Sequence, residues 1–207
     1  MKLKKKVKNT IVIVLVIIVA ILIGLVVLNH TKKSKTKEVK VVDKIDKYGY
    51  KLKETKTDTY KKMFKELKDI LSKEKVNQED YVKKISEMFV YDFYSLKDKL
   101  AKTDIGGVDF LYPAASDNFL LNAQDTYYKY VESNIYGNRN QDLPEVDKIE
   151  IKDVSQKAFA YQDKTDEEAY FVDVSWSYKD EKFTDYQKNA TLVFIHDDIK
   201  LCLVELQ

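Results

Sequence analysis

The sequence predicts an α+β domain behind a transmembrane helix, and three observations lead to this prediction. An uncharged apolar run fills residues 11–28, apolar side chains at helical spacing follow as far as residue 133, and beyond Pro144 the spacing changes to the period of two that is typical of strands. We expect an N-terminal transmembrane helix and then three helices packed on a curved antiparallel sheet of four to six strands. Strands and helices do not alternate, which excludes a doubly wound parallel sheet.

Four segments are predicted along the chain. A basic tail occupies residues 1–9, the transmembrane helix residues 10–30, a lysine-rich juxtamembrane linker residues 31–55 and the α+β soluble domain residues 56–207. Within the linker, residues 44–54 are a candidate for extended structure. The chain of 207 residues contains only five glycines and two prolines, which excludes a collagen-like or low-complexity protein.

The apolar run reads IVIVLVIIVAILIGLVVL and contains eighteen residues without a charge. As a helix it would be roughly 27 Å long at about 1.5 Å per residue, close to the ~30 Å hydrocarbon core of a bilayer. A cleavable signal peptide has a shorter apolar stretch of about 7–15 residues and a small-residue cleavage motif, and neither is visible. The run therefore predicts an uncleaved single-pass anchor in the cell membrane.

Lysines surround this predicted anchor. Five precede the run and five follow it before Asp43, so the positive-inside rule leaves the orientation undecided. The short N-terminal tail and the long domain behind the run favour an extracytoplasmic domain. The lysines that flank the anchor, as lipid contacts or as a solvated spacer, are Lys5, Lys6, Lys8, Lys32 and Lys33. Arg139 is the only arginine among 36 basic residues, a bias that points to an AT-rich bacterial genome.

The net charge is divided unevenly along the chain. Residues 1–43 contain ten lysines and two carboxylates, a net charge of +8, so the whole-chain charge of +2 leaves −6 for the remaining 164 residues. A nucleic-acid-binding domain would carry its positive charge on the folded module. The acidic domain therefore argues against nucleic acid as a partner and favours the lipid bilayer and other proteins.

Three amphipathic segments are predicted as helices. The first has apolar residues at steps of four, three and four from Tyr60 to Leu71, with Thr57 or Asp58 as its candidate N-cap. The second runs from its candidate N-cap, Asn77, to about Tyr94. An irregular stretch with the turn signal Gly106-Gly107 follows. The third helix is expected over residues 116–133.

Alternating patterns in the last third of the chain predict an antiparallel sheet. Residues 170–178 alternate most regularly, and His196-Asp197-Asp198 is predicted as a hairpin turn between two further strands. The other predicted strands cover residues 149–151, 159–161, 190–195 and 199–206.

This order of elements resembles the nuclear transport factor 2-like fold, a likeness carried by the three helical stripes and by the strand YFVDVSWSY at residues 170–178. The resemblance covers roughly residues 56–206. It implies a cone of helices packed into a strongly curved antiparallel sheet, which can enclose an apolar pocket. A single membrane helix joined to such a domain is also similar to the inner-membrane assembly proteins of type IV secretion and conjugation machines, which implies self-association.

The domain offers few candidates for catalysis or for metal binding. His196 is the one histidine after the predicted anchor, and no G-x-S-x-G motif accompanies it. Cys202 could approach His196 across the hairpin turn, but a small apolar filler is the favoured interpretation. The adjacent His196, Asp197 and Asp198 are poorly placed to converge on one ion, and phosphate-binding and calcium-binding loop motifs are absent. We therefore expect no cofactor and no metal.

Two groups of residues are candidates for a functional site. Asp92 lies among aromatic residues in FVYDFYSL, where burial would raise the pKa of its carboxyl and suit it to acid–base work. The alternative is that the Asp92 carboxylate lies on the polar face of the helix or caps a neighbouring backbone segment. The other candidates to line a pocket in the cone are Tyr127, Val174, Trp176 and Tyr178. Ordinary core packing is the alternative for these four.

The leading hypothesis is a membrane-tethered, non-catalytic interaction or scaffold domain of the bacterial cell envelope, with protein partners or self-association. The alternative is a tethered domain that binds a small apolar ligand in the cone. A third hypothesis is an enzyme that uses Asp92 and a neighbouring tyrosine as acid and base, which rests on analogy of fold.

Overall fold

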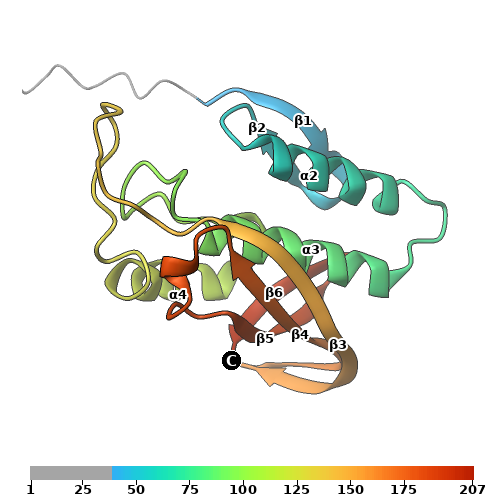
Figure 1. The fold of residues 1–207 in the computed structure, drawn as a ribbon. Coiled ribbons are helices and arrows are strands. Elements are labelled where there is room, and N and C mark those ends of the chain that lie inside the picture. The colour runs from blue at the N-terminus through green and yellow to red at the C-terminus, as the bar shows by residue number, and fades with distance from the viewer. Residues whose placement is uncertain (1–38) are drawn as a thin grey trace, which may run out of the picture. The chain divides into compact units, whose positions relative to one another are not determined.

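The computed structural model describes residues 39–207, and their fold is α+β, with three helices and two antiparallel sheets (Figure 1). The helices are α2 (Asp58–Leu71), α3 (Gln78–Tyr94) and α4 (Pro113–Asp125). The two-stranded sheet consists of β1 (Val41–Ile45) and β2 (Tyr50–Lys53). The four-stranded sheet has the order β3 (Val146–Tyr161), β4 (Lys164–Tyr178), β5 (Asn189–Asp197) and β6 (Lys200–Leu206). Short 3-10 turns cover Asp46–Tyr48, Val108–Phe110 and Glu181–Phe183.

The predicted fold includes a membrane-spanning helix, and the part of the chain that the structure describes contains none. No helix among residues 39–207 is long and apolar enough to cross a membrane. The longest, α3, has 17 residues and includes the charged Glu79, Lys83 and Lys84, whereas a spanning helix needs about 20 predominantly apolar residues. The transmembrane helix predicted at residues 10–30 and the lysines flanking it lie outside the described residues. The single-pass, signal-anchored membrane localisation expected from the sequence is therefore not supported by the fold of residues 39–207.

A second correction concerns the sheets. A single sheet is predicted, but residues 41–53, inside the segment predicted as a linker, form a separate antiparallel hairpin. Tyr50 and Leu52 are buried while the lysines between and after them face solvent, so the strand has the alternation of a half-buried edge. The hydroxyl oxygens of Tyr50 and Tyr81 lie 2.7 Å apart and join this hairpin to α3. One compact unit covers Lys40–Gln207 and includes this hairpin.

Helices α2 and α3 lie close to the predicted bounds, and a polar cap begins each. The Thr57 hydroxyl accepts the backbone N–H of Tyr60, and the Asn77 side chain accepts the N–H groups of Glu79 and Asp80. Helix α3 lies between α2 and the four-stranded sheet (Figure 1). Its buried residues therefore surround the helix rather than forming a stripe.

Helix α4 begins and ends earlier than the predicted residues 116–133. Pro113 occupies its first turn, where a missing N–H costs nothing and the fixed φ is already helical. The helix ends at Thr126, whose φ of −117° and ψ of −94° are not helical. The Asn122 carbonyl accepts both the Thr126 backbone N–H at 3.0 Å and the Thr126 hydroxyl at 2.5 Å, which closes this end of the helix.

Strands β3 and β4 form one long hairpin in place of the separate short strands predicted near residues 149–151 and 159–161. The register places Ile151 opposite Val174, and Gln162, with a φ of 55°, lies in the turn. Three register shifts interrupt the pairing along β3. Such bulges bend a strand and increase its twist, which accounts for the way the hairpin curls round at the end of the sheet (Figure 1).

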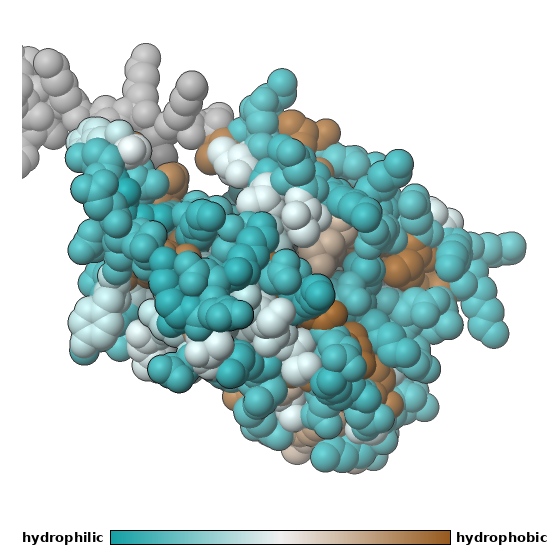
Figure 2. Space-filling model, in the orientation of Figure 1, coloured by the Kyte–Doolittle hydropathy of each residue, from teal (hydrophilic) through white to brown (hydrophobic). Residues whose placement is uncertain are grey.

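The four-stranded sheet buries side chains on both faces. One face packs on α3 in the main core, which includes Val172, Val174, Trp176, Leu192, Phe194 and Leu203. The opposite face forms a smaller cluster of Ala169, Phe171, Val193 and Ile195, against which Tyr112, Phe159, Tyr161 and Val204 pack. The surface seen in Figure 2 is mostly hydrophilic, with apolar side chains in small separate groups. This face therefore carries no large continuous apolar surface.

Candidate functional site

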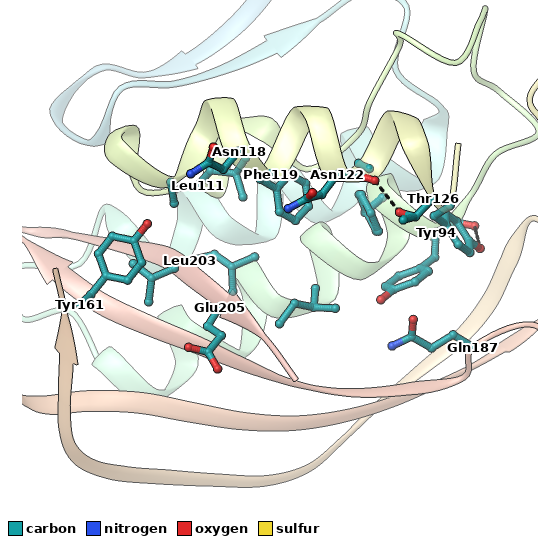
Figure 3. Close-up of a pocket in the computed structure, with 16 residues that line it drawn as sticks. Tyr94, Leu111, Asn118, Phe119, Asn122, Thr126, Tyr161, Gln187, Leu203 and Glu205 are labelled. Carbon is teal, nitrogen blue, oxygen red and sulfur yellow. Dashed lines mark hydrogen bonds between the residues drawn. The ribbon is translucent and has the colours of Figure 1, made fainter. Parts of the chain in front are cut away.

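A cleft of about 380 Å³ lies between α4 and β6. Figure 3 shows its walls: Asn118, Phe119 and Asn122 come from α4, and Leu203 and Glu205 come from β6. Tyr94 and Gln187 lie at one end of the cleft and Tyr161 at the other (Figure 3). We call this site the α4–β6 cleft.

Pro113 explains why a cleft forms at this place. Just before it, Leu111 pairs with Leu203 of β6 in a single parallel bridge, and the Tyr112 N–H donates to the Leu203 carbonyl at 2.8 Å. Helix α4 then begins at Pro113, and a helix cannot continue the strand pairing. The chain therefore leaves β6 at this point, and the space between the helix and the rest of the strand becomes the cleft.

The α4 wall has a polar stripe. Asn118, Asn122 and Thr126 follow one another at intervals of four residues, so they share one face of the helix. Ala115 and Phe119 lie beside them and also line the cleft. The wall therefore combines amide groups, which both donate and accept hydrogen bonds, with apolar surface.

Tyr94, the last residue of α3, contributes an unusual hydroxyl group to the cleft. The residue is 1% exposed, and its ring packs against Trp176 with 4.1 Å between ring centroids. The hydroxyl is buried and has no hydrogen-bond partner among the described residues. Burial raises the pKa of the Tyr94 hydroxyl, so it stays protonated at neutral pH and is available as a donor. An unsatisfied buried polar group costs about 1–3 kcal/mol.

The other aromatic residues beside Tyr94 satisfy one another. The Tyr178 hydroxyl lies 3.1 Å from the Tyr127 hydroxyl, accepts from Trp176 Nε1 at 3.0 Å and donates to the Gln187 carbonyl at 2.7 Å. This network fixes the end of the cleft. The structure thus brings the side chains of Tyr127, Trp176 and Tyr178 together, as expected of residues that are predicted to line one pocket.

The predicted pocket residues nevertheless occupy different places. Only Tyr127 lines the α4–β6 cleft. Val174 and Trp176 are buried in the main core, and Tyr178 is packed against that core. The interior of the predicted cone is therefore occupied by these side chains, and the open space lies at its edge.

Asp92 lies in a separate buried cluster. Its two carboxylate oxygens each lie 2.6 Å from Lys56 Nζ, one accepts from Lys99 Nζ at 3.1 Å, and the other accepts the Gly107 N–H at 2.8 Å. Burial by itself raises the pKa of Asp92, but Lys99, Lys56 and the Gly107 N–H outweigh it and hold the pKa at about 2. The direction is opposite to the one expected from the sequence, because Lys56 comes from a distant segment and Lys99 reaches back to Asp92 from beyond the end of α3.

The Gly106-Gly107 pair, predicted as a turn, is required by this cluster. A Cβ on Gly106 would lie 1.9 Å from the Asp92 carbonyl oxygen, and Gly107 has a φ of 75°. Only glycine allows both the close approach and the left-handed conformation. The turn thereby directs the Gly107 N–H at the Asp92 carboxylate.

His196 and Cys202 do not form a pair. Cys202 lies opposite Ile195 in the β5–β6 ladder and is buried, which raises the pKa of its thiol to about 11. His196 Nδ1 lies 2.9 Å from the Asp166 carboxylate, which also accepts the His196 backbone N–H at 2.6 Å. Within residues 39–207 no group of three or more His, Cys, Asp or Glu side chains is placed to hold a metal ion.

Sequence reasoning overlooked the residues that line most of the cleft. The polar stripe of Asn118, Asn122 and Thr126 is a readable signal, because amides at intervals of four interrupt an otherwise amphipathic helix. Glu205 and Gln187 carry no such signal, since their position depends on the tertiary fold.

Comparisons with known proteins found no matching family model, no curated relative and no similar solved structure. The resemblance to nuclear transport factor 2-like domains and to type IV secretion assembly proteins therefore stays a prediction.

Proposed function

We propose that this chain is a non-catalytic binding domain and that the α4–β6 cleft receives its partner. Tyr94 carries the proposal, because this residue lines the cleft and its buried hydroxyl has no hydrogen-bond partner among the described residues. A bound group that accepts its hydrogen bond would recover part of the cost of burying it. The amide side chains of Asn118 and Asn122 supply further donors and acceptors nearby.

Two observations favour binding over catalysis. The Asp92 carboxylate is engaged by two lysines and a backbone N–H, and its low pKa keeps it from acting as an acid or base near neutral pH. The Cys202 thiol is buried, and its raised pKa keeps it protonated at neutral pH. Neither group lines the α4–β6 cleft.

A small apolar ligand is the second candidate for the partner. The cleft volume of about 380 Å³ falls within the ~300–1,000 Å³ that is usual for small-molecule pockets. Because Val174 and Trp176 fill the predicted cone, such a ligand would bind at its edge, between α4 and β6.

Two tryptophan variants test the proposal on the full chain. Asn122→Trp places a bulky side chain in the cleft, and Asp117→Trp places the same side chain on α4 outside the cleft; both positions are exposed, so both variants should fold. The probes are a library of small aromatic amides and a library of random peptides, with binding followed by NMR.

The proposal expects binders from at least one library, with binding lost in Asn122→Trp and kept in Asp117→Trp. Binders that Asn122→Trp retains would place the binding elsewhere and contradict the proposal. A wild-type chain that binds nothing from either library would contradict it as well.

A further inference from the structure

Strand β6 is the edge of the four-stranded sheet, and most of its outer side is already paired. The Leu201 N–H donates to the Tyr81 hydroxyl at 3.2 Å, and the Leu203 carbonyl accepts the Tyr112 N–H at 2.8 Å. Beyond Leu203 no strand pairs with the outer side of β6 among residues 39–207. The unpaired part of the edge is therefore confined to the last residues of the strand, which line the α4–β6 cleft.

The ladder shows which backbone groups point into the cleft. Thr191 and Gln207 exchange two hydrogen bonds of 3.0 Å, so the backbone of Gln207 points inward to β5. Leu206 lies opposite Leu192 and is the next residue along the strand. Because antiparallel pairs alternate between hydrogen-bonded and non-hydrogen-bonded positions, the N–H and carbonyl of Leu206 point away from β5. An outward N–H and carbonyl of this kind can pair with a further strand.

The chain itself shows that an extended segment fits against this edge. Leu111 and Tyr112 run alongside β6 with strand pairing at Leu203, and they lie at the beginning of the cleft. The pairing stops because α4 begins at Pro113, and not because the edge of β6 ends. An added segment would continue along β6 from the place that Tyr112 leaves.

The lining of the cleft suits a peptide in composition. The polar stripe of α4 and Gln187 present amides that can pair with backbone N–H and carbonyl groups, and Leu111, Phe119 and Leu206 provide apolar contacts. Glu205 is the only charged residue that lines the cleft. A partner side chain beside Glu205 is therefore expected to be basic or neutral.

We propose that the partner is an extended peptide segment of another protein, which adds to the free edge of β6 as a fifth strand and carries a basic residue beside Glu205. This inference rests on the proposed function, since it names the class of partner that the α4–β6 cleft takes. Main-chain hydrogen bonds to Leu206 provide affinity in this mode, and the amides, the Tyr94 hydroxyl and Glu205 select the side chains.

The experiment uses random peptides of about nine residues, a length that exceeds one strand, displayed on phage and selected on the full-length chain. Selected peptides are then synthesised in three forms: with free amides, with the odd-numbered amides N-methylated and with the even-numbered amides N-methylated. Their affinity is measured for the wild-type chain and for Leu206→Pro, which removes both the outward N–H and the leucine side chain that lines the cleft. Leu206→Ala, which removes the side chain and keeps the N–H, is the reference for the affinity of Leu206→Pro. Proline is tolerated at such positions of an edge strand, and circular dichroism checks that the variant is folded.

The proposal expects one of the two N-methylated forms to bind the wild-type chain about tenfold more weakly, or weaker still, than the peptide with free amides. It expects Leu206→Pro to weaken binding of the peptide with free amides by a similar factor relative to Leu206→Ala. The strand-pairing mode would be overturned if both methylated forms bound as tightly as the peptide with free amides. It would also be overturned if a folded Leu206→Pro bound the peptide as tightly as Leu206→Ala. Binding of aromatic amides in the cleft without any peptide binder would overturn this inference and leave the proposed function standing. A dimer of the chain that Leu206→Pro dissociates would make a second copy the occupant and would also overturn it.

Discussion

The backbone N–H of Tyr112 donates to the Leu203 carbonyl at 2.8 Å, and this hydrogen bond marks where the chain leaves the edge of the sheet. One residue later α4 begins, and the helix diverges from β6. The α4–β6 cleft is thus a consequence of a proline at the first turn of a helix. Both proposals on the function of the domain follow from that divergence.

Tyr94→Phe should leave the free energy of unfolding unchanged or raise it by up to about 1 kcal/mol, because the lost hydroxyl is buried without a partner. Urea denaturation measures the change. The matched control is Tyr128→Phe, which loses a bond to the Phe93 carbonyl at 2.7 Å and one from the Gly106 N–H at 3.1 Å. That control should cost about 1–3 kcal/mol. Equal losses in both variants would show that the Tyr94 hydroxyl has a partner in the folded protein.

Asp92 makes the stability depend on acid pH. Its folded pKa of about 2 is below the ordinary value of 3.8, so its contribution is fully present above about pH 4 and is lost as the pH falls toward 2. The loss amounts to about 2 kcal/mol by the linkage relation. Denaturation between pH 5 and pH 2 measures it, with Asp92→Asn as the reference.

Asp92→Asn itself should lower the free energy of unfolding at neutral pH by about 3–5 kcal/mol, because it removes the carboxylate that Lys56 and the buried Lys99 share and leaves Lys99 with Asp98 alone. The part of the acid sensitivity due to Asp92 should be absent in this variant. The same acid dependence in Asp92→Asn and in the wild-type chain would contradict the assignment to Asp92.

Gly106→Ala should be strongly destabilising, by more than about 3 kcal/mol, because the added Cβ would overlap the Asp92 carbonyl oxygen at 1.9 Å. Gly137→Ala is the control. Gly137 has a φ of 71° but nothing within 4 Å of the added Cβ, so only the backbone strain of about 1–2 kcal/mol is expected. Thermal unfolding compares the two, and similar losses would show that the Gly106 contact relaxes.

Arg139→Lys should lower the free energy of unfolding by about 1 kcal/mol. The guanidinium donates to the carbonyls of Lys97 at 2.8 Å, Lys99 at 2.7 Å and Glu132 at 3.2 Å, and so joins two loops. The single ammonium of lysine cannot span these acceptors. Urea denaturation measures the loss, and an unchanged midpoint would mean that the loops hold together without the guanidinium.

The sequence predicts a helix or strand well where its buried side chains recur at the regular spacing of that element. The apolar stripe of α2 and the caps Thr57 and Asn77 are visible in the sequence and lie where expected, because they depend on neighbours within one turn. The alternation of β4 over residues 170–178 also matches the strand. The sequence indicates residues 44–54 as a candidate for extended structure, which agrees with β2, but it does not predict the pairing with β1, because frequent lysines hide the burial of Tyr50 and Leu52.

The candidate site was less predictable, since it depends on contacts between distant segments. The sequence indicates that Asp92 lies among aromatic residues, but it cannot show that Lys56 approaches from another element and reverses the expected shift of the pKa. The aromatic residues proposed for a pocket are neighbours in space, yet Trp176 packs into the core on Tyr94. The cleft depends on the crossing of α4 and β6, which no local pattern encodes.

Hydrogen exchange of the Leu206 amide in the full chain, with and without a selected peptide, tests the central claim most directly. The account predicts that this outward N–H exchanges rapidly in the free chain and slows by about tenfold or more when the peptide binds. The Gln207 N–H, already bonded to the Thr191 carbonyl at 3.0 Å, should change little and serves as the internal control. A bound peptide that leaves the exchange of the Leu206 amide unchanged would contradict the claim that the partner pairs with β6.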